Sequence, residues 1–309
     1  MNIEQSMNSV FEETWWIETV TGAPPRQIVI EEDEKAIACW NIYAKGKKIL
    51  MPPLTQTCGP CIYIDDNMSI NEQSEHIKRA IYALLEKAAF YSEITIALDP
   101  KLDYFLPFFW KGFRIIPSIS YRITELNDLE KVFANFTKNI RRDIKRAEKL
   151  LHIVDDLDIN EFHHLMEQTF AEQKRKYPYS RQLLENIIRN ATKHGAGKVM
   201  YAVDDENNIH AAAFFLHDAR TCYYLIAGKN SAYKNSNAPT FLIWEGIKYA
   251  ATVSRQFDFE GSMIEGIENF FRRFGGTPIV YYRVEKGSVV NAAKAALKPY
   301  IKRLLHYKV

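Results

Sequence analysis

Apolar residues recur with two different periods along this chain, and the periods predict where helices and strands lie. Between Asn71 and Phe90 they stand three and four positions apart, which is typical of an amphipathic helix. Three short apolar runs separated by polar turns, at 198–203, 209–216 and 221–226, predict an antiparallel meander. Strands and helices that alternate in this way indicate a layered α/β protein.

The stretch from Gln256 to Gly276 is the most informative of these patterns. Its run Phe257-Asp258-Phe259-Glu260 alternates with a period of two, so both rings should face one side of a short strand and both carboxylates the other. Helical spacing follows from residue 263 to residue 274 and ends at two glycines. A carboxylate pair at a strand end, one short helix away from Arg272 and Arg273, is a candidate site for a polar or anionic ligand.

A basic surface is predicted on a helix between Asn127 and His152. Six cations recur there at spacings of three and four, which places them on one face, while apolar residues occupy the opposite face. Either this is a solvated basic face, or it contacts phosphates of tRNA, a nucleotide diphosphate or coenzyme A. The six are Lys138, Arg141, Arg142, Lys145, Arg146 and Lys149.

Composition narrows the class of protein. A length of 309 residues favours two domains, and the net charge of +2 argues against a dedicated nucleic-acid coat. No apolar run is long enough to span a membrane and the N-terminus is not a secretory signal, so a cytoplasmic location is expected. The pair Cys58 and Cys61 forms a CxxC sequence, but a strand-like triplet follows it instead of the helix that a redox site needs. No metal site is expected, because no second such pair or paired histidine lies at ligand spacing.

Five short blocks occur in an order that resembles the Fem aminoacyltransferases and the related FemAB-like branch of the GNAT acyltransferase superfamily. The last of them ends in Arg273-Phe274-Gly275-Gly276 and follows the Asp258 strand. The blocks span most of the chain. The other four are Pro52-Pro53-Leu54-Thr55-Gln56 with Gly59-Pro60, Trp110-Lys111-Gly112-Phe113, Asn139 to Glu148, and Glu167-Gln168-Thr169-Phe170.

The resemblance implies an α/β (α+β) fold made of tandem GNAT-like domains, each a mixed, largely antiparallel sheet flanked by helices. The expected boundaries are 1–126 for a degenerate N-terminal GNAT-like domain and 127–309 for the acyltransferase domain. A basic C-terminal helix is expected at 291–307. Donor and acceptor would lie in a cleft between the domains.

Acyl transfer to an amine needs a deprotonated amine, a polarised carbonyl and a held donor. In GNAT enzymes the donor lies where the fourth and fifth strands split apart, and a backbone N–H meets its carbonyl. The resemblance assigns that split here to the strands at 221–226 and 256–259, with Tyr224 and Gly228 lining it and a bulge around Ala227-Gly228. Candidate catalytic residues are Asp258 and Glu260, with Glu265 as a weaker one. The alternative to a catalytic role is that these carboxylates are solvated or cap the next helix.

Two departures from the family pattern bear on the donor. The glycine loop that holds the coenzyme A pyrophosphate at a helix N-terminus is replaced by Lys229 to Pro239, in which Lys229 and Lys234 are the remaining cations. The family's usual lysine in the closing block is replaced by Phe271, so phosphate contacts would fall to Arg272 and Arg273.

The predicted function is an N-acyltransferase that forms an amide on an amino group of a cell-envelope precursor or amino sugar. No tightly bound cofactor is expected; acyl coenzyme A and aminoacyl-tRNA are both open as co-substrate. The partners would be a small-molecule or nucleotide-linked sugar acceptor, with tRNA as a further candidate. The alternative is a catalytically silent protein that binds a nucleotide-sugar or polysaccharide precursor.

Overall fold

The computed structural model describes residues 7–155, 158–172, 174–261 and 263–287. The helix expected at 291–307 lies outside the described residues. The described chain divides into two compact units, one formed by 25–117 with 282–287 and the other by 7–24 and 118–281. The chain thus changes unit within the two long strands β7 (Arg114–Ile123) and β13 (Thr277–Lys286).

The first unit combines a small antiparallel sheet with a second group of strands. The small sheet has the order β1-β2-β5, and the second group has the order β3-β4-β6 followed by the end of β13. Its long helix, α2, begins at a reciprocal capping box between Ser69 and Glu72, which satisfies N–H groups that a helix start leaves open. The bounds are β1 (Arg26–Glu32), β2 (Lys35–Ile42), β3 (Ala44–Lys45), β4 (Lys48–Ile49), β5 (Cys61–Ile62), α2 (Ile70–Lys87), β6 (Glu93–Ala97) and α3 (Leu106–Trp110).

The second unit is built on a mixed sheet in the strand order β13-β7-β12-β11-β10-β9-β8. The predicted meander is confirmed, because β9, β10 and β11 pair antiparallel. The strands are β8 (His152–Val154), β9 (Gly197–Val203), β10 (Ile209–His217), β11 (Thr221–Lys229) and β12 (Gln256–Asp258). The helices are η2 (Val10–Glu12), α1 (Thr14–Thr21), α4 (Leu129–Asn135), α5 (Lys138–Ala147), α6 (Ile159–Glu172), α7 (Arg181–Lys193), η3 (Ser231–Tyr233), α8 (Ala238–Val253) and α9 (Glu265–Arg272).

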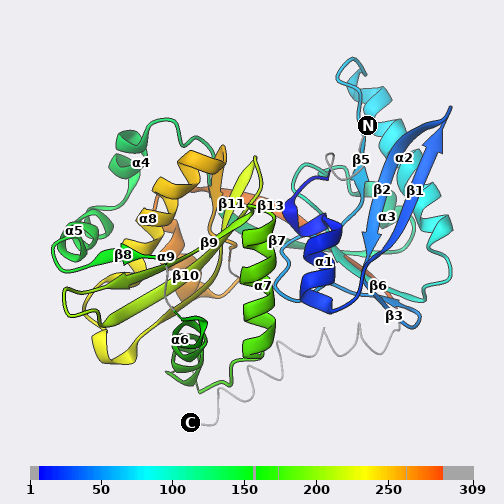
Figure 1. Cartoon of the computed structure of the whole chain (residues 1–309). Helices are drawn as coiled ribbons and strands as arrows, with labels where there is room; N and C mark the ends of the chain where they lie inside the picture. The colour runs from blue at the N-terminus through cyan, green and yellow to red at the C-terminus, as the bar shows by residue number, and fades with distance from the viewer. Residues whose placement is uncertain (1–6, 156–157, 173, 262, 288–309) are drawn as a thin grey trace, which may run out of the picture. The chain divides into compact units, whose positions relative to one another are not determined.

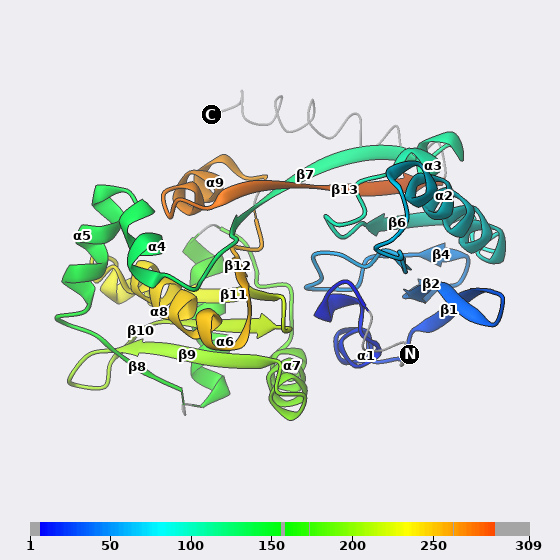
Figure 2. The same ribbon diagram turned by 90° about the horizontal axis from the view of Figure 1, so that it is seen from above.

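Helices cover both faces of this sheet (Figure 1). Adjacent residues of β10 show the two faces: the Phe214 ring lies against Gly197 and Ala191 of α7, whereas the Phe215 ring lies against Gly246 of α8. The main core lies on the α8 face, where α4, α5 and α8 pack together (Figure 2). The predicted fold class, a mixed α/β arrangement of largely antiparallel sheets flanked by helices, is confirmed.

One predicted helix is wrong in its length. The single helix expected from Asn127 to His152 is two helices, α4 and α5, interrupted at Phe136 and Thr137. The Phe136 ring is buried against Trp244 and Phe274, and the Thr137 N–H donates to the Arg273 carbonyl at 2.9 Å instead of to a carbonyl of its own helix. Tertiary contacts therefore override a helical pattern that is continuous in the sequence.

The predicted domain boundary after residue 126 stays a prediction. The compact units assign 118–126 to the same body as the following helices, and they assign the end of β13 to the other body. Contacts in space and repeats in sequence are different criteria for a domain, so the two divisions need not coincide.

Candidate functional site

Strands β11 and β12 run side by side for only three residues and then separate. They pair in parallel from Thr221 and Gln256 to Tyr223 and Asp258, where β12 ends. β11 continues to Lys229 in its pairing with β10. The predicted split between these two strands is therefore present, and Asp258 lies at the point where it opens.

The bulge in β11 is not where the sequence placed it. The pairing of β10 with β11 shifts register between Phe214 and Phe215, whose partners are Ile226 and Tyr224, so Leu225 is the extra residue and not Ala227 or Gly228. Gly228 instead lies under α6, where a Cβ would stand 2.1 Å from the Met166 Cε and 2.9 Å from the Leu165 carbonyl. A bulge interrupts the ladder locally, so backbone groups beside Leu225 are available at the split.

Asp258 is held in a buried polar cluster. Its side chain is fully buried, and it accepts hydrogen bonds from the Ser120 hydroxyl, the Arg122 Nε and, at 2.7 Å, the Glu260 N–H. The Arg122 side chain is only 6% exposed. An aspartate enclosed in this way fixes the strand end and cannot reach a ligand in solvent.

The environment of Glu260 differs from that of Asp258. It is half-buried, and its φ of 62° lies in the left-handed region, which a residue with a side chain adopts at an energetic cost. Burial, followed by the negative charge of Asp258, raises the pKa of Glu260 to about 8. The strained backbone turns this carboxyl away from the strand pattern and holds it beside another carboxylate.

Gly261 keeps that strained turn in place. Its φ of 65° is also left-handed, and a Cβ there would stand 2.5 Å from the Ile119 carbonyl oxygen of β7. Only glycine meets both requirements without displacing β7.

Helix α9 carries the remaining candidates of the closing block. Glu265 is exposed in its first turn, and Arg272 pairs with Glu268 at 3.3 Å, which in turn accepts from the Tyr121 hydroxyl at 2.6 Å. Arg273 is exposed, and its guanidinium makes no ion pair or hydrogen bond within the described part of the chain. The two arginines therefore do not face Asp258, whose cationic partner is Arg122.

Aromatic rings fill the α9 side of the split. Phe271 is buried with ring centroids 6.1 Å from Tyr224 and 5.3 Å from Phe259, and Phe274 packs on Phe259 at 5.5 Å. Burial raises the pKa of the Tyr224 hydroxyl. Phe271, which stands where the resembled family pattern has a lysine, thus forms part of an apolar wall of the split.

The loop from Lys229 to Asn237 precedes α8. Most of its polar groups already form hydrogen bonds or ion pairs with other groups of the protein. The Lys229 and Lys234 ammonium groups pair with Glu172 at 3.0 and 3.2 Å, and they lower the pKa of that carboxyl. Pro at the second position of α8 removes one N–H from the helix start. Backbone N–H groups that already donate to protein oxygens are those of residues 229, 230, 231, 232, 233, 236 and 238.

The basic face of α5 gathers the six cations, five of them on the helix and Lys149 just after its end. Ile140, Ile144 and Ala147 are buried, while the six cations together line a shallow cavity of about 390 Å³. Arg141 donates to the Ala134 carbonyl and Arg142 lies 3.5 Å from Asp143. Among the described residues the other four make no ion pair, so most of this charge is available to an anionic ligand.

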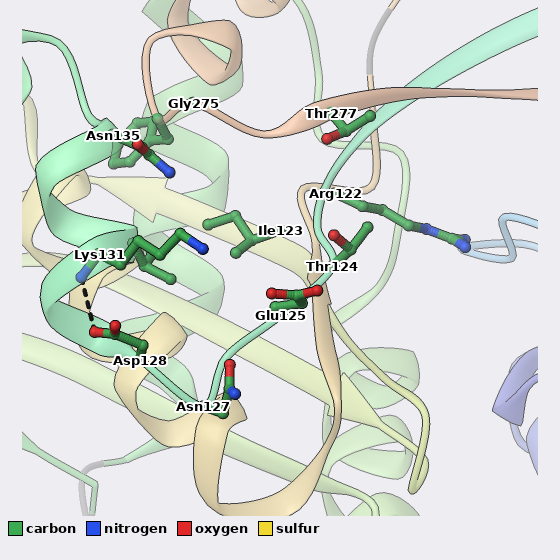
Figure 3. Close-up of a pocket in the computed structure, with 12 residues that line it drawn as sticks. Arg122, Ile123, Thr124, Glu125, Asn127, Asp128, Lys131, Asn135, Gly275 and Thr277 are labelled. Atoms are coloured by element: carbon green, nitrogen blue, oxygen red, sulfur yellow. Dashed lines mark hydrogen bonds between the residues drawn. The ribbon is translucent and has the colours of Figure 1, made fainter.

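A separate polar cavity of about 400 Å³ lies between the end of β7, α4 and the turn after α9 (Figure 3). Figure 3 shows Lys131 reaching from α4 toward β7, while the Arg122 side chain points away from the cavity. Sequence analysis did not single out this cavity, because its walls come from segments about 140 residues apart in the chain.

Two further predictions concern cysteines and metals. Cys61 opens strand β5 and no helix begins there, and all four cysteines are buried. Among the described residues no group of three or more His, Cys, Asp and Glu side chains is arranged to hold a metal ion.

A membrane-spanning helix, which would have to be both long and apolar, is absent from the described ranges.

Sequence reasoning missed three residues that hold the site together. Ser120 and Arg122 stand in β7 next to Ile119, Tyr121 and Ile123, and Glu172 ends a helix that is far along the chain from the lysines it pairs with. An arginine at a position whose neighbours in the strand are apolar is a signal for a buried ion pair. Its partner cannot be read from the sequence, since it lies 136 residues away.

Comparison with known proteins agrees with this geometry. Residues 134–272 match the model of the acetyltransferase (GNAT) domain, and no curated protein matches the sequence significantly. The solved structure of FemX is 14% identical over 90% of this chain and 93% of its own, with a TM-score of 0.67. Residues 134–272 therefore carry a GNAT-type acetyltransferase domain by sequence, and the chain shares the fold of FemX.

Two lysylphosphatidylglycerol synthetase structures share the fold. The C-terminal domain of a putative synthetase from Agrobacterium fabrum is 11% identical, with coverage of 96% of this chain and 94% of that one and a TM-score of 0.57. The enzyme from Bacillus licheniformis is 12% identical, with coverage of 82% and 83% and a TM-score of 0.51. The sequence match thus covers the GNAT domain at 134–272, and the three structures show that the fold extends over most of the chain.

Proposed function

We propose that this protein transfers an aminoacyl group from aminoacyl-tRNA to an amino group of a cell-envelope precursor or amino sugar. The observation that carries the proposal is Glu260, a half-buried carboxyl on a strained backbone at the opening of the β11–β12 split, with its pKa raised to about 8. The reaction would take place in the cytoplasm, where charged tRNA is found.

Glu260 suits the role of general base. An amine is a nucleophile only after it has lost its proton, and a base whose pKa is close to the working pH is the most effective at taking it. The amine nitrogen would bond to the acyl carbon as the ester bond breaks, and the proton would pass through Glu260 to the departing hydroxyl. Backbone groups at the Leu225 bulge would polarise the acyl carbonyl.

The other predicted carboxylates take supporting roles. Asp258 positions Glu260, because it accepts the Glu260 N–H and its charge contributes to the raised pKa. Glu265 is exposed in the first turn of α9 and would meet the acceptor's ammonium group before deprotonation.

Two features favour aminoacyl-tRNA over acyl coenzyme A as the donor. The loop before α8 offers few free N–H groups and no unpaired lysine for a pyrophosphate, and Phe271 fills the α9 side of the split. The basic face of α5 instead offers an extended row of cations, which suits a nucleic-acid backbone. Arg273 would add a further phosphate contact.

The envelope acceptor is supported by the comparisons. Two of the structures that share this fold are lysylphosphatidylglycerol synthetases, whose name describes the joining of lysine to a membrane lipid. An envelope component as acceptor and an amino acid as the transferred group extend that chemistry to this chain.

The test is a transfer assay with radiolabelled aminoacyl-tRNA and UDP-linked amino sugars. Glu260→Gln should lower kcat by about a hundredfold or more, because it removes a general base without changing side-chain size. Glu206→Gln, in the exposed turn between β9 and β10, is the matched control and should keep full activity.

The donor is tested in the same assay with acetyl coenzyme A in place of the charged tRNA. Neutralising Arg142, Lys145 and Arg146 should weaken transfer from tRNA and reduce its dependence on salt. Transfer from acetyl coenzyme A alone would contradict the proposed donor, whereas ligand binding without any transfer would favour the binding-protein alternative.

A further inference from the structure

The cavity of Figure 3 has polar walls whose side chains are not used by the fold. The segment after β7, helix α4 and the start of β13 supply these walls, all within the second unit. In the described part of the chain, none of six lining side chains makes a hydrogen bond or an ion pair. They are Thr124, Glu125, Asn127, Lys131, Asn135 and Thr277.

Lys131 and Glu125 are the informative pair. An ammonium and a carboxylate line the same cavity from α4 and from the segment after β7, yet they do not pair with one another or with any other described group. Asp128 shows the contrast: its carboxylate is already used, because it accepts the Lys131 backbone N–H at 2.9 Å and caps α4. Both side chains are exposed, and a cation and an anion that line one open cavity complement a ligand that carries both charges.

The remaining walls fit a small, partly apolar molecule. Ile123, Val132 and Phe274 are each less than 10% exposed and form a rigid apolar floor. Amides and hydroxyls surround the two charges and can donate to or accept from polar groups of a ligand. A volume of about 400 Å³ lies at the lower end of the range typical of ligand sites.

We propose that this cavity binds a free α-amino acid, with its carboxylate on Lys131 and its ammonium group on Glu125. Asn127 and Asn135 orient the two charged ends, and the side chain of the amino acid lies over Ile123 and Val132. The site is separate from Glu260, so the proposal does not depend on the transfer reaction and the two can fail independently.

The experiment measures binding to the full chain and needs no activity. Each standard L-amino acid is first screened by thermal shift, because a ligand of the native state raises the unfolding midpoint. The amino acid with the largest shift is then titrated by calorimetry, together with its N-acetyl and methyl ester forms. The N-acetyl form lacks the ammonium group, and the ester lacks the carboxylate.

The expected result is a loss of roughly tenfold in affinity for Glu125→Gln and for Lys131→Met, the usual effect of one charge-assisted hydrogen bond. Glu125→Gln should not weaken the N-acetyl form further, and Lys131→Met should not weaken the ester further. The controls Glu130→Gln, on α4 outside the cavity, and Lys193→Met, on α7, should bind like the unaltered chain.

Three outcomes would overturn the proposal. The first is a screen in which no amino acid raises the midpoint. The second is equal affinity for the amino acid, its N-acetyl form and its ester. The third is unaltered affinity in both cavity variants, which are exposed substitutions that leave the core untouched.

Discussion

Two carboxyl groups of the second unit have opposite environments: Glu172, beside the loop that precedes α8, and Glu260, directly after β12. Glu172 is pinned by the Lys229 and Lys234 ammonium groups, which lower its pKa. Glu260 is half-buried beside Asp258, and its pKa is raised to about 8. The first is a closed ion-pair cluster, and the second is a carboxyl whose raised pKa lies close to neutral pH.

The two environments suit different tasks. A phosphate-binding loop needs free N–H groups and cations, and the loop beside Glu172 has used most of both within the protein. A general base needs a pKa near neutrality, and the strand end at Glu260 provides one through burial and a like charge. Under the proposed function, a phosphate-bearing donor would instead be recognised by the basic face of α5, where four of the six cations make no ion pair within the described residues.

The largest expected effect concerns the cluster that supports Glu260. Asp258→Asn should lower the free energy of unfolding by about 3–5 kcal/mol, because it leaves the buried Arg122 without its counter-charge. Urea denaturation followed by circular dichroism measures the loss. A change as small as that of the exposed control Glu206→Gln would mean that this ion pair does not hold the strand end.

The next effect is on the rate of transfer. If ionised Glu260 takes the proton, kcat should rise about tenfold per pH unit well below its pKa, about fiftyfold in total from pH 6 to pH 8, and level off above pH 8. Steady-state kinetics across this range, with Glu260→Gln as the comparison, measures the slope. A profile that is flat in the unaltered enzyme would show that another group, or none, is the base.

A smaller effect is expected on stability. The pKa of Glu260 is about 8 in the folded chain against 4.5 for an ordinary glutamate, so between these values the unfolded state loses a proton that the folded state keeps. The free energy of unfolding should therefore fall as pH rises through this window, by about 2 kcal/mol in total after solvent screening. Glu260→Gln should remove that part of the slope, and an unchanged slope would place the titrating group elsewhere.

The smallest effect is expected at the loop. Glu172→Gln breaks two ion pairs whose lysines are 40% and 62% exposed, so the loss of stability should be below about 1 kcal/mol and smaller still at high salt. Thermal unfolding at low and high salt measures it. A loss as large as that of Asp258→Asn would erase the contrast between the two regions.

Much of the fold was readable from the sequence because local patterns decide local structure. The capped helix α2, the meander β9–β11 and the alternation that buries Phe257 and Phe259 all follow from periods of 3.6 and 2. The pattern failed at Phe136 and Thr137, where contacts with Phe274 and Arg273 end one helix and start another.

The candidate site could be predicted only in part. The sequence placed Asp258 and Glu260 on one side of a strand as a pair of equivalent carboxylates. Their roles differ because Arg122 and Ser120, from a strand more than 130 residues away, enclose the first, while a left-handed turn at Glu260 and Gly261 releases the second.

By itself, then, the sequence determined the order of helices and strands, the charged face of α5 and the positions of the acidic residues, since each depends on neighbours in the chain. Only the tertiary structure determines which charges are paired and where β11 and β12 separate. It also determines that Lys131 and Glu125, which do not pair, line the same cavity. The physical reason is that burial and pairing depend on distances in space between residues far apart in the chain, and these distances set the pKa values and the open sites.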